Sequence, residues 1–426
     1  MKEFEGKKVL VLAGQDVHRK LVETAQSMGI YTIVADYLEN SPCKKIADES
    51  SMISILDVNA IVKYCKENNV DAVLNFCNDP AARIVQRVNS ELGHYNIGTW
   101  EQVCTFTDKE LFKKACVRNG VDIVPTYSLD DLETGKIVYP VIVKPSDSRG
   151  SRGSVVCQNE NELRGAIEIA KGASDSQHVI IEKYMGGCQE VEITYLVIEE
   201  TPYLISFADR YTGKYEDGTD KISSCMIEPS WFIDKYLEKV DPKVKRMLQN
   251  EGIRNTAIIM QGFIDGEIVR MFDPGMRFQG NEFERVLLRA CGINAMESII
   301  TYALTGKMEA FGGKYIGCYD LNGKCAVQYM VNGGPGTISK YVGTEEVKKY
   351  PGFVYLGYKY DIGEKVERTR DTKQRLFDIS FLVDRSRDSI IDSIDFVNNH
   401  LCVLDENGED MIVSKFDYRK VYPHIL

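Results

Sequence analysis

The stretch YPVIVKPSDSRGSRGS, residues 139–154, says more about the fold of this chain than any other segment. Its two strand valines can be buried on one face, and Lys144 leaves the end of the strand as a point charge. Gly150 and Gly153 have no Cβ, so the backbone N–H groups of this loop can approach phosphate oxygens closely. The stretch therefore predicts a strand followed by a phosphate-binding loop, although plain turns after strands have a similar composition.

Two more strands are predicted shortly after this loop. Residues 179–185, VIIEKYM, form an apolar run that ends in charged residues and then turns through two glycines. Residues 190–194, EVEIT, alternate polar and apolar side chains, which predicts a half-buried strand.

Another group of polar residues lies on a predicted β-hairpin. Residues 256–263 form an apolar run with one polar side chain, Gln261, and an Asp-Gly-Glu turn joins this run to residues 268–277. The second strand carries Asp273 and Arg277. The chain thus places, in order, a lysine strand, a glycine loop, a Glu-Lys hinge, and two paired strands with an oxygen ligand, a carboxylate and an arginine.

This order resembles the ATP-grasp superfamily, most closely its biotin-carboxylase and carbamoyl-phosphate-synthetase-like branch of carboxylate ligases, from about Lys7 to about Arg289. The family's first ATP lysine begins a helix, matched by residues 107–110, TDKE, which also read as a capping box. The resemblance implies ATP and Mg²⁺ as cofactors, with Mn²⁺ as a substitute. The residues that it assigns to ATP binding are Lys109, Lys144, Ser146, Ser151, Gly153, Glu182, Lys183, Tyr184, Met185 and Glu190.

The resemblance also implies a metal site with two departures from the family pattern. Gln261 and Asp273 match its metal ligands, and Arg277 matches the arginine of its Glu-x-Asn-x-Arg signature. Asp273 replaces a glutamate, and Gly275 stands where the asparagine ligand of a second metal is expected. Aspartate is a hard oxygen donor suited to Mg²⁺, so one metal ion is expected.

A second metal ion would need other ligands. Asn281 and Glu282 could donate oxygen atoms from a shifted position. The alternative for the whole metal site is that residues 273–275, DPG, form an ordinary turn with no ligand role, which is disfavoured because Arg277 and Gln261 fall at the right distances.

The chain is predicted to fold as three α/β and α+β domains. Residues 1–104 are expected to form a Rossmann-like domain, residues 105–306 an ATP-grasp domain with two nucleotide-clasping sheets, and residues 307–426 a small, mainly β domain. The last piece resembles the C-terminal domain of amino-acid ligases and carboxylases, and no catalytic constellation is visible in its sequence.

The first domain alternates strands and helices, which implies a parallel sheet. Strand-like runs occupy residues 9–12, 31–34 and 72–76. Only Gly14 follows the first strand, so the dinucleotide-binding fingerprint is missing and an NAD-dependent oxidoreductase is disfavoured. The apolar positions of the intervening helix are Val58, Ile61, Val62 and Cys65.

Two residues are candidates for substrate contact. Asp79 follows a strand of the first domain, where ligands of parallel sheets bind, although an aspartate before proline also caps helices. Arg210 begins a long polar segment, residues 209–224, of the kind that forms lids over sites. The alternative for Arg210 is a solvated surface charge.

Composition narrows the class of protein. The chain has 52 Lys and Arg residues against 63 Asp and Glu residues, a net charge of −11, which argues against nucleic acid or an anionic membrane as a partner. No apolar run approaches about 18 residues, so no membrane insertion is expected. The 12 cysteines form no C-x-x-C pair, which favours reduced thiols in the cytoplasm over a zinc site.

The predicted reaction follows from the charges. A carboxylate attacks the γ-phosphate of ATP to give an acyl phosphate, and an amine, or another nucleophile, captures the acyl group. Lys144, Arg277 and magnesium would stabilise the charge on the phosphoryl oxygens. The partners are then small carboxylates and amines, and a homodimer is compatible with the resemblance. Two alternatives stay open: a catalytically reduced ATP-binding protein, and a carbamoyl-phosphate-synthetase-like enzyme or carboxylase that uses bicarbonate.

Overall fold

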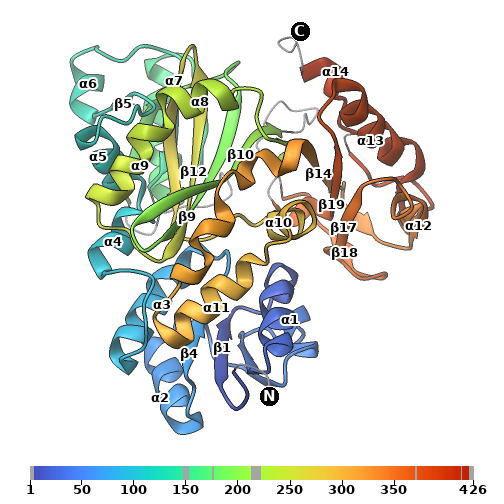
Figure 1. The fold of residues 1–426 in the computed structure, drawn as a ribbon. Coiled ribbons are helices and arrows are strands. Elements are labelled where there is room, and N and C mark those ends of the chain that lie inside the picture. The colour runs from blue at the N-terminus through green and yellow to red at the C-terminus, as the bar shows by residue number, and fades with distance from the viewer. Residues whose placement is uncertain are drawn as a thin grey trace.

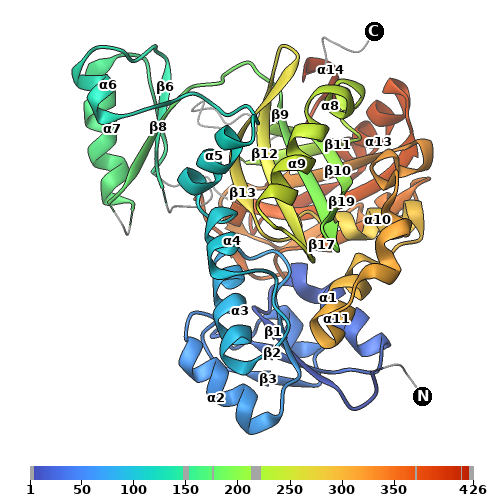
Figure 2. The same cartoon turned by 60° about the vertical axis from the view of Figure 1, so that its left-hand side comes forward.

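The structure, a computed structural model, describes residues 4–146, 153–174, 177–212, 222–369, 372–413 and 415–421. Figures 1 and 2 show its three β-layers: a small sheet near the N-terminus, a large central sheet, and a second small sheet that stands off to one side of the large one.

The N-terminal layer is a parallel sheet of four strands in the order β3-β2-β1-β4. Its core strands are apolar along their length because helices cover both faces. The predicted helix is present, and all four of its predicted apolar residues are buried. The elements are β1 (Lys8–Leu12), α1 (Arg19–Ser27), β2 (Tyr31–Ala35), β3 (Glu49–Ser51), α2 (Val58–Asn68), β4 (Ala72–Leu74), α3 (Asp79–Leu92) and α4 (Trp100–Thr105).

The second layer is the antiparallel sheet that carries the lysine strand, in the order β5-β8-β6-β7. Val141 and Val143 are fully buried against α7, as their alternation predicts, while Lys144 lies on the opposite face. The elements are α5 (Lys109–Arg118), β5 (Thr126–Tyr127), α6 (Leu129–Glu133), β6 (Val141–Pro145), β7 (Val155–Cys157), α7 (Glu160–Gly172) and β8 (Val179–Lys183).

The third layer is a sheet of eight strands in the order β13-β12-β9-β10-β11-β14-β19-β17. Strands from residues 190–275 and from residues 324–384 share this sheet, so it crosses the predicted boundary near residue 306. The strands are β9 (Glu190–Ile198), β10 (Thr201–Thr212), β11 (Ser223–Glu228), β12 (Thr256–Asp265), β13 (Ile268–Gly275), β14 (Lys324–Asn332), β17 (Phe353–Tyr358) and β19 (Arg375–Asp384).

Helices cover both faces of the large sheet (Figure 1). α8 and α9 pack on the odd-numbered apolar residues of β9, and α10 and α11 connect the opposite face to the N-terminal layer. The helices are α8 (Ile233–Lys239), α9 (Asp241–Asn250), α10 (Phe283–Cys291), α11 (Ala295–Thr305), α12 (Thr344–Val347), α13 (Arg387–His400) and α14 (Tyr418–Val421), and short strands β15 (Gly336–Thr337), β16 (Lys340–Val342), β18 (Lys365–Val366) and β20 (Cys402–Leu404) complete the C-terminal part.

The predicted fold class is confirmed, and four local expectations are wrong. The strand expected at residues 72–76 ends at Leu74. The strand at residues 190–194 is nearly all buried rather than half-buried, because packed elements cover both of its faces. The cap of α5 is Asp108, which accepts from the N–H groups of the next turn, so residues 107–110 form no capping box. The cap of α3 is Asn78 rather than Asp79.

Candidate active site

Two lysines share one buried carboxylate at the edge of the small antiparallel sheet. Lys144 Nζ lies 2.6 Å from Glu182 Oε2, and Lys113 of α5 forms an ion pair with the other carboxylate oxygen. Lys113 also donates to Thr126 Oγ1 at 2.9 Å. Burial alone would raise the pKa of Glu182, but the two ammonium groups outweigh it and hold the pKa below its ordinary value. Glu182 is therefore an ionised counter-charge for both lysines.

Two side-chain contacts link the lysine sheet and the preceding helix α5 to the large sheet. Lys144 Nζ lies 5.0 Å from the centre of the Phe272 ring on β13. From α5, Lys109 Nζ lies 3.1 Å from Asp273 Oδ1. Lys109 and Lys113 are one helical turn apart and point to neighbouring carboxylates, so α5 supplies a cation to each sheet.

Three polar residues form a row across the end of the large sheet. Gln261 of β12 pairs directly with Asp273 of β13 on one side and with Glu192 of β9 on the other. Gln261 Nε2 donates to Glu192 Oε2 at 2.8 Å. Cross-strand partners share one face of a sheet, so the two predicted metal ligands lie side by side with Glu192 next to them.

A second carboxylate of β9 adjoins this row. Glu190 Oε1 forms an ion pair with Arg210 Nη1 at 2.6 Å. Burial raises the pKa of Glu190, and the negative charges of Glu192 and Asp273 add to the rise while Arg210 opposes it. Glu192 and Asp273 therefore both lie within electrostatic reach of Glu190.

The oxygen donors of this row fit a magnesium ion that is shared with a nucleotide. Asp273 and Gln261 offer a carboxylate and an amide oxygen. Within the described ranges, no group of three or more His, Cys, Asp and Glu side chains is arranged to hold a metal ion. Mg²⁺ is usually held by only one or two carboxylates together with phosphate oxygens and water, so two protein donors suffice.

The shifted ligands proposed for a second metal do not reach this row. Asn281 donates to Gln328 Oε1 of β14 at 3.0 Å, and Glu282 pairs with Arg285 at 2.7 Å. β14 is five strands away from β13, so Asn281 lies across the sheet from Asp273. Glu192, two residues after Glu190, is the oxygen donor that the structure brings beside Gln261 instead.

The glycine loop is described only at its two ends. Ser146 donates its backbone N–H to the carbonyl of His178 at 3.0 Å. Gly153 has φ +74°, and a Cβ on it would lie 2.6 Å from the Cβ of Ala173, so only glycine fits there. Ser151 and Gly150 lie outside the described residues.

The predicted Glu-Lys hinge, residues 182–185, uses some of its backbone groups in hydrogen bonds within the protein. Lys183 and Tyr184 donate their N–H groups to the carbonyls of Pro125 and Pro140, at 2.9 and 3.0 Å. The side chains of Lys183 and Tyr184 are exposed, whereas Met185 is buried.

The two substrate candidates lie on different layers. Arg210 is paired with Glu190 and mostly buried, so it is not a solvated surface charge. Asp79 is the first residue of α3 in the N-terminal layer.

The predicted catalytic arginine follows the ligand hairpin. Arg277 donates from Nη1 to the carbonyl of Phe278 at 2.8 Å, just after β13.

Three residues of the site had no place in the sequence prediction: Lys113, Glu192 and Phe272. Lys113 could have been found from its spacing of four residues from Lys109 on the same helix. Glu192 could have been found because it shares a strand face with Glu190. Phe272 carries no sequence signal, since aromatic residues in strands usually pack in the core.

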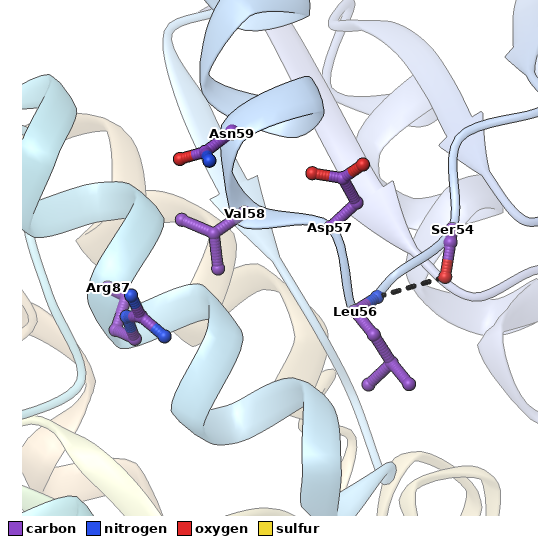
Figure 3. Close-up of a pocket in the computed structure, with 6 residues that line it drawn as sticks. All are labelled: Ser54, Leu56, Asp57, Val58, Asn59 and Arg87. Carbon is purple, nitrogen blue, oxygen red and sulfur yellow. Dashed lines mark hydrogen bonds between the residues drawn. The ribbon is translucent and has the colours of Figure 1, made fainter.

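A hollow of about 430 Å³ lies elsewhere, at the start of α2 (Figure 3). Asp57, which caps α2, and Arg87 of α3 line it together with Leu56, whose N–H donates to Ser54 Oγ at 3.3 Å. None of the predicted ATP, metal or substrate residues borders it.

Comparison with known proteins agrees with the ATP-binding class of protein that this site indicates. Residues 108–206 match the family described as carbamoyl-phosphate synthase L chain, ATP binding domain. This segment holds Lys109, Lys144 and Glu182, but the row on β12 and β13 lies beyond it. Together with the fold, the match confirms the resemblance to the ATP-grasp superfamily.

Individual relatives are similar over different lengths. A formate-dependent phosphoribosylglycinamide formyltransferase of Sulfurisphaera tokodaii is 31% identical over 209 residues, which cover 46% of this chain and 52% of the relative. The chain thus spans about half the length of this curated relative. An L-amino acid ligase of Bacillus licheniformis has the same fold, with a TM-score of 0.77 and 17% identity over 95% of this chain and 100% of the other.

A third structure is the biotin carboxylase domain of a 2-oxoglutarate carboxylase of Hydrogenobacter thermophilus, in complex with MgADP, ADP and bicarbonate. Its TM-score is 0.75 at 19% identity, over 93% of this chain and 91% of the other. Among the described helices, none is both long and apolar enough to span a bilayer.

Proposed function

We propose that this protein is an ATP- and Mg²⁺-dependent ligase that activates a carboxylate as an acyl phosphate and transfers the acyl group to an amine, releasing ADP and phosphate. The observation that carries the proposal is the approach of Lys144 to Phe272, at 5.0 Å from the ring, directly beside Asp273. A phosphate-binding lysine and a metal-binding carboxylate are thereby held at one point between two sheets.

The proposed roles follow from the charge of each group. Lys144 and Lys109 bind phosphate oxygens, and Arg277 stabilises the transferring phosphoryl group with its planar guanidinium. Asp273 and Gln261 hold magnesium, which neutralises charge on the phosphates when it is bound. Burial of the carboxylates in this site makes every such interaction stronger than it would be in water.

The resemblances and the charges support this reaction over the alternatives. An ATP-binding protein without catalysis would not need Arg277 and the Asp273 row beside the lysines. A bicarbonate-using enzyme stays the second candidate, supported by the fold that the chain shares with the biotin carboxylase domain described above. Use of Mn²⁺, a homodimer, a cytoplasmic location and the three domain boundaries stay predictions.

The test is ADP release by the intact protein with ATP, Mg²⁺ and a pool of carboxylates and amines. Steady release that requires two co-substrates is expected. Asp273→Asn and Arg277→Lys should lower turnover at least a hundredfold while ATP binding persists, because their contacts strengthen in the transition state. Near-normal turnover in either variant would contradict the mechanism, and Asp384→Asn, an exposed change on β19, is the control.

A further inference from the structure

Two cysteines that the proposed reaction does not use lie together at the end of α10. Cys291 is the last residue of α10, and Cys318 is the first residue of η4 (Cys318–Gly323), a 3-10 helix that precedes β14. Cys291 Sγ donates to the carbonyl oxygen of Cys318 at 3.8 Å, and Cys318 Sγ donates to the carbonyl oxygen of Lys314 at 3.1 Å. The carbonyl oxygen and the sulfur of Cys318 each lie two bonds from its Cα. Side-chain rotation therefore brings the two sulfur atoms together.

Contacts around the pair hold the two backbones side by side. Asn322 Nδ2 of η4 donates to the carbonyl oxygen of Ala290 at 2.8 Å, and Asp320 Oδ1 forms an ion pair with Arg385 Nη2 at 2.8 Å. Cys318 belongs to the apolar cluster between the N-terminal layer and the large sheet, and Cys291 packs against the same cluster. Disulfide geometry tolerates little backbone displacement, so a pair that is already fixed in this way is suited to form one.

The two thiols differ in acidity and exposure. A hydrogen bond with Cys318 lowers the pKa of the Cys291 thiol, while burial and Asp320 oppose the shift. The same hydrogen bond, together with burial, raises the pKa of Cys318. Burial also raises the pKa of three other half-buried thiols, Cys104, Cys188 and Cys402. The thiolate is the reactive form of cysteine, so half-buried Cys291 is the thiol that a small oxidant attacks first and buried Cys318 is its partner.

We propose that Cys291 and Cys318 form a reversible oxidation site for hydrogen peroxide, in which Cys291 reacts first and Cys318 completes a disulfide. The Cys291 thiolate attacks one peroxide oxygen, the O–O bond breaks, and Cys291 becomes a sulfenic acid. The leaving hydroxide takes up the proton that the Cys291 thiol released. The Cys318 sulfur then attacks the sulfenic sulfur, the S–S bond forms, and the S–O bond breaks. The second hydroxide takes the Cys318 proton, so one peroxide and two thiols give one disulfide and two waters.

The disulfide would tie together a junction between two layers of the fold. The segment between the two cysteines contains α11, which packs on α1 and β4 of the N-terminal layer. On the other side, η4 packs on β10 and β14 of the large sheet. Oxidation would therefore enclose α11 in a covalent loop at this junction, and a small thiol would open the loop by exchange.

Mass spectrometry reads the two cysteines separately because trypsin cuts between them. Cleavage after Arg289, Lys307, Lys314 and Lys324 gives the peptides 290–307 and 315–324, each with one cysteine. The intact, reduced protein is treated with hydrogen peroxide, free thiols are alkylated, and the digest is analysed without reductant. We expect a disulfide between these two peptides that dithiothreitol reverses, with Cys291 consumed about tenfold faster than Cys402. Consumption of Cys291 without this disulfide, or no faster than that of Cys402, would overturn the proposal.

Variants separate the roles of the two cysteines. Cys291→Ser should abolish the disulfide, and Cys402→Ser, at another half-buried cysteine, should keep it. In Cys318→Ala the sulfenic acid of Cys291 has no partner thiol, so it should persist and react with dimedone more than in wild type. Equal dimedone labelling of Cys291 in both proteins would refute the role of Cys318.

Two features of the design keep the outcome clear. Cys318 is buried, so Cys318→Ala is first checked for folding by its thermal unfolding. If it fails to fold, the peptide maps of wild type and Cys291→Ser decide alone. The measurements need neither ATP nor a co-substrate, so failure of the proposed function leaves this result unchanged.

Discussion

Replacing Glu182 by glutamine tests the charge arrangement on which the site depends. Glutamine keeps the shape of the side chain but leaves the ammonium groups of Lys113 and Lys144 facing a neutral amide. Their side chains are only 7% and 13% exposed, so water cannot replace the lost carboxylate. Removal of one partner from a buried ion pair costs about 3–5 kcal/mol.

The assay is thermal and urea unfolding of wild type and Glu182→Gln. A loss of 1 kcal/mol lowers Tm by about 2–4 °C in a domain of 150–250 residues, so a fall of about 6–20 °C is expected. Glu168→Gln is the control, because the Glu168 side chain is 73% exposed and pairs with Lys171 at the surface. An exposed pair contributes at most about 1 kcal/mol.

The pH dependence gives an independent reading of the same residue. The folded-state pKa of Glu182 is lowered, so its contribution is present above its ordinary pKa and is lost as pH falls through the lower, folded-state value. Glu182→Gln should abolish that loss at acid pH. If Glu182→Gln lowers the free energy of unfolding by less than about 1 kcal/mol, and the loss of stability at acid pH is the same as in wild type, then Glu182 is not the counter-charge of both lysines.

Two further variants test other parts of the argument. Lys144→Ala should weaken ATP binding more than tenfold in calorimetry, because a hydrogen bond to a charged group contributes about 1.5–3 kcal/mol, and unchanged affinity would remove Lys144 from the site. Burial raises the pKa of Asp209 from 3.8 to about 7, so the folded state binds the extra proton and stability should fall as pH rises from about 4 to 7. Asp209→Asn should flatten that fall in urea unfolding between about pH 4 and 7, and an identical slope in both proteins would contradict the assignment.

The lysine strand and the ligand hairpin were predictable because their signals are local. Val141 and Val143 alternate with half-buried positions, and the strand they predict is β6. Gln261 and Asp273 sit on two runs joined by a recognisable turn, and the structure pairs them directly. Short-range patterns of this kind depend on few contacts outside the motif.

The partners of these residues were not predictable from local patterns. Lys113 and Glu182 are 69 residues apart, and their ion pair depends on how α5 packs against β8. Glu192 was assigned to a half-buried strand, since alternation alone does not reveal that a second layer covers the polar face. The shift of a helix cap from Thr107 to Asp108 is a competition between two adjacent capping residues, which sequence alone resolves poorly.

The charges of the site explain why nucleotide and metal should bind together. Lys109 pairs with Asp273, and Lys144 pairs with Glu182, so each of these four charges already has an opposite partner. ATP alone would place phosphate charge next to Asp273 and Glu192 while it attracts the lysines. A magnesium nucleotide instead offers a cation to Asp273 and anions to the lysines, so Asp273 and Lys109 each exchange one opposite partner for another, while Glu182 keeps Lys113. Since an unpaired buried charge costs several kcal/mol, this exchange favours the metal complex over either component alone.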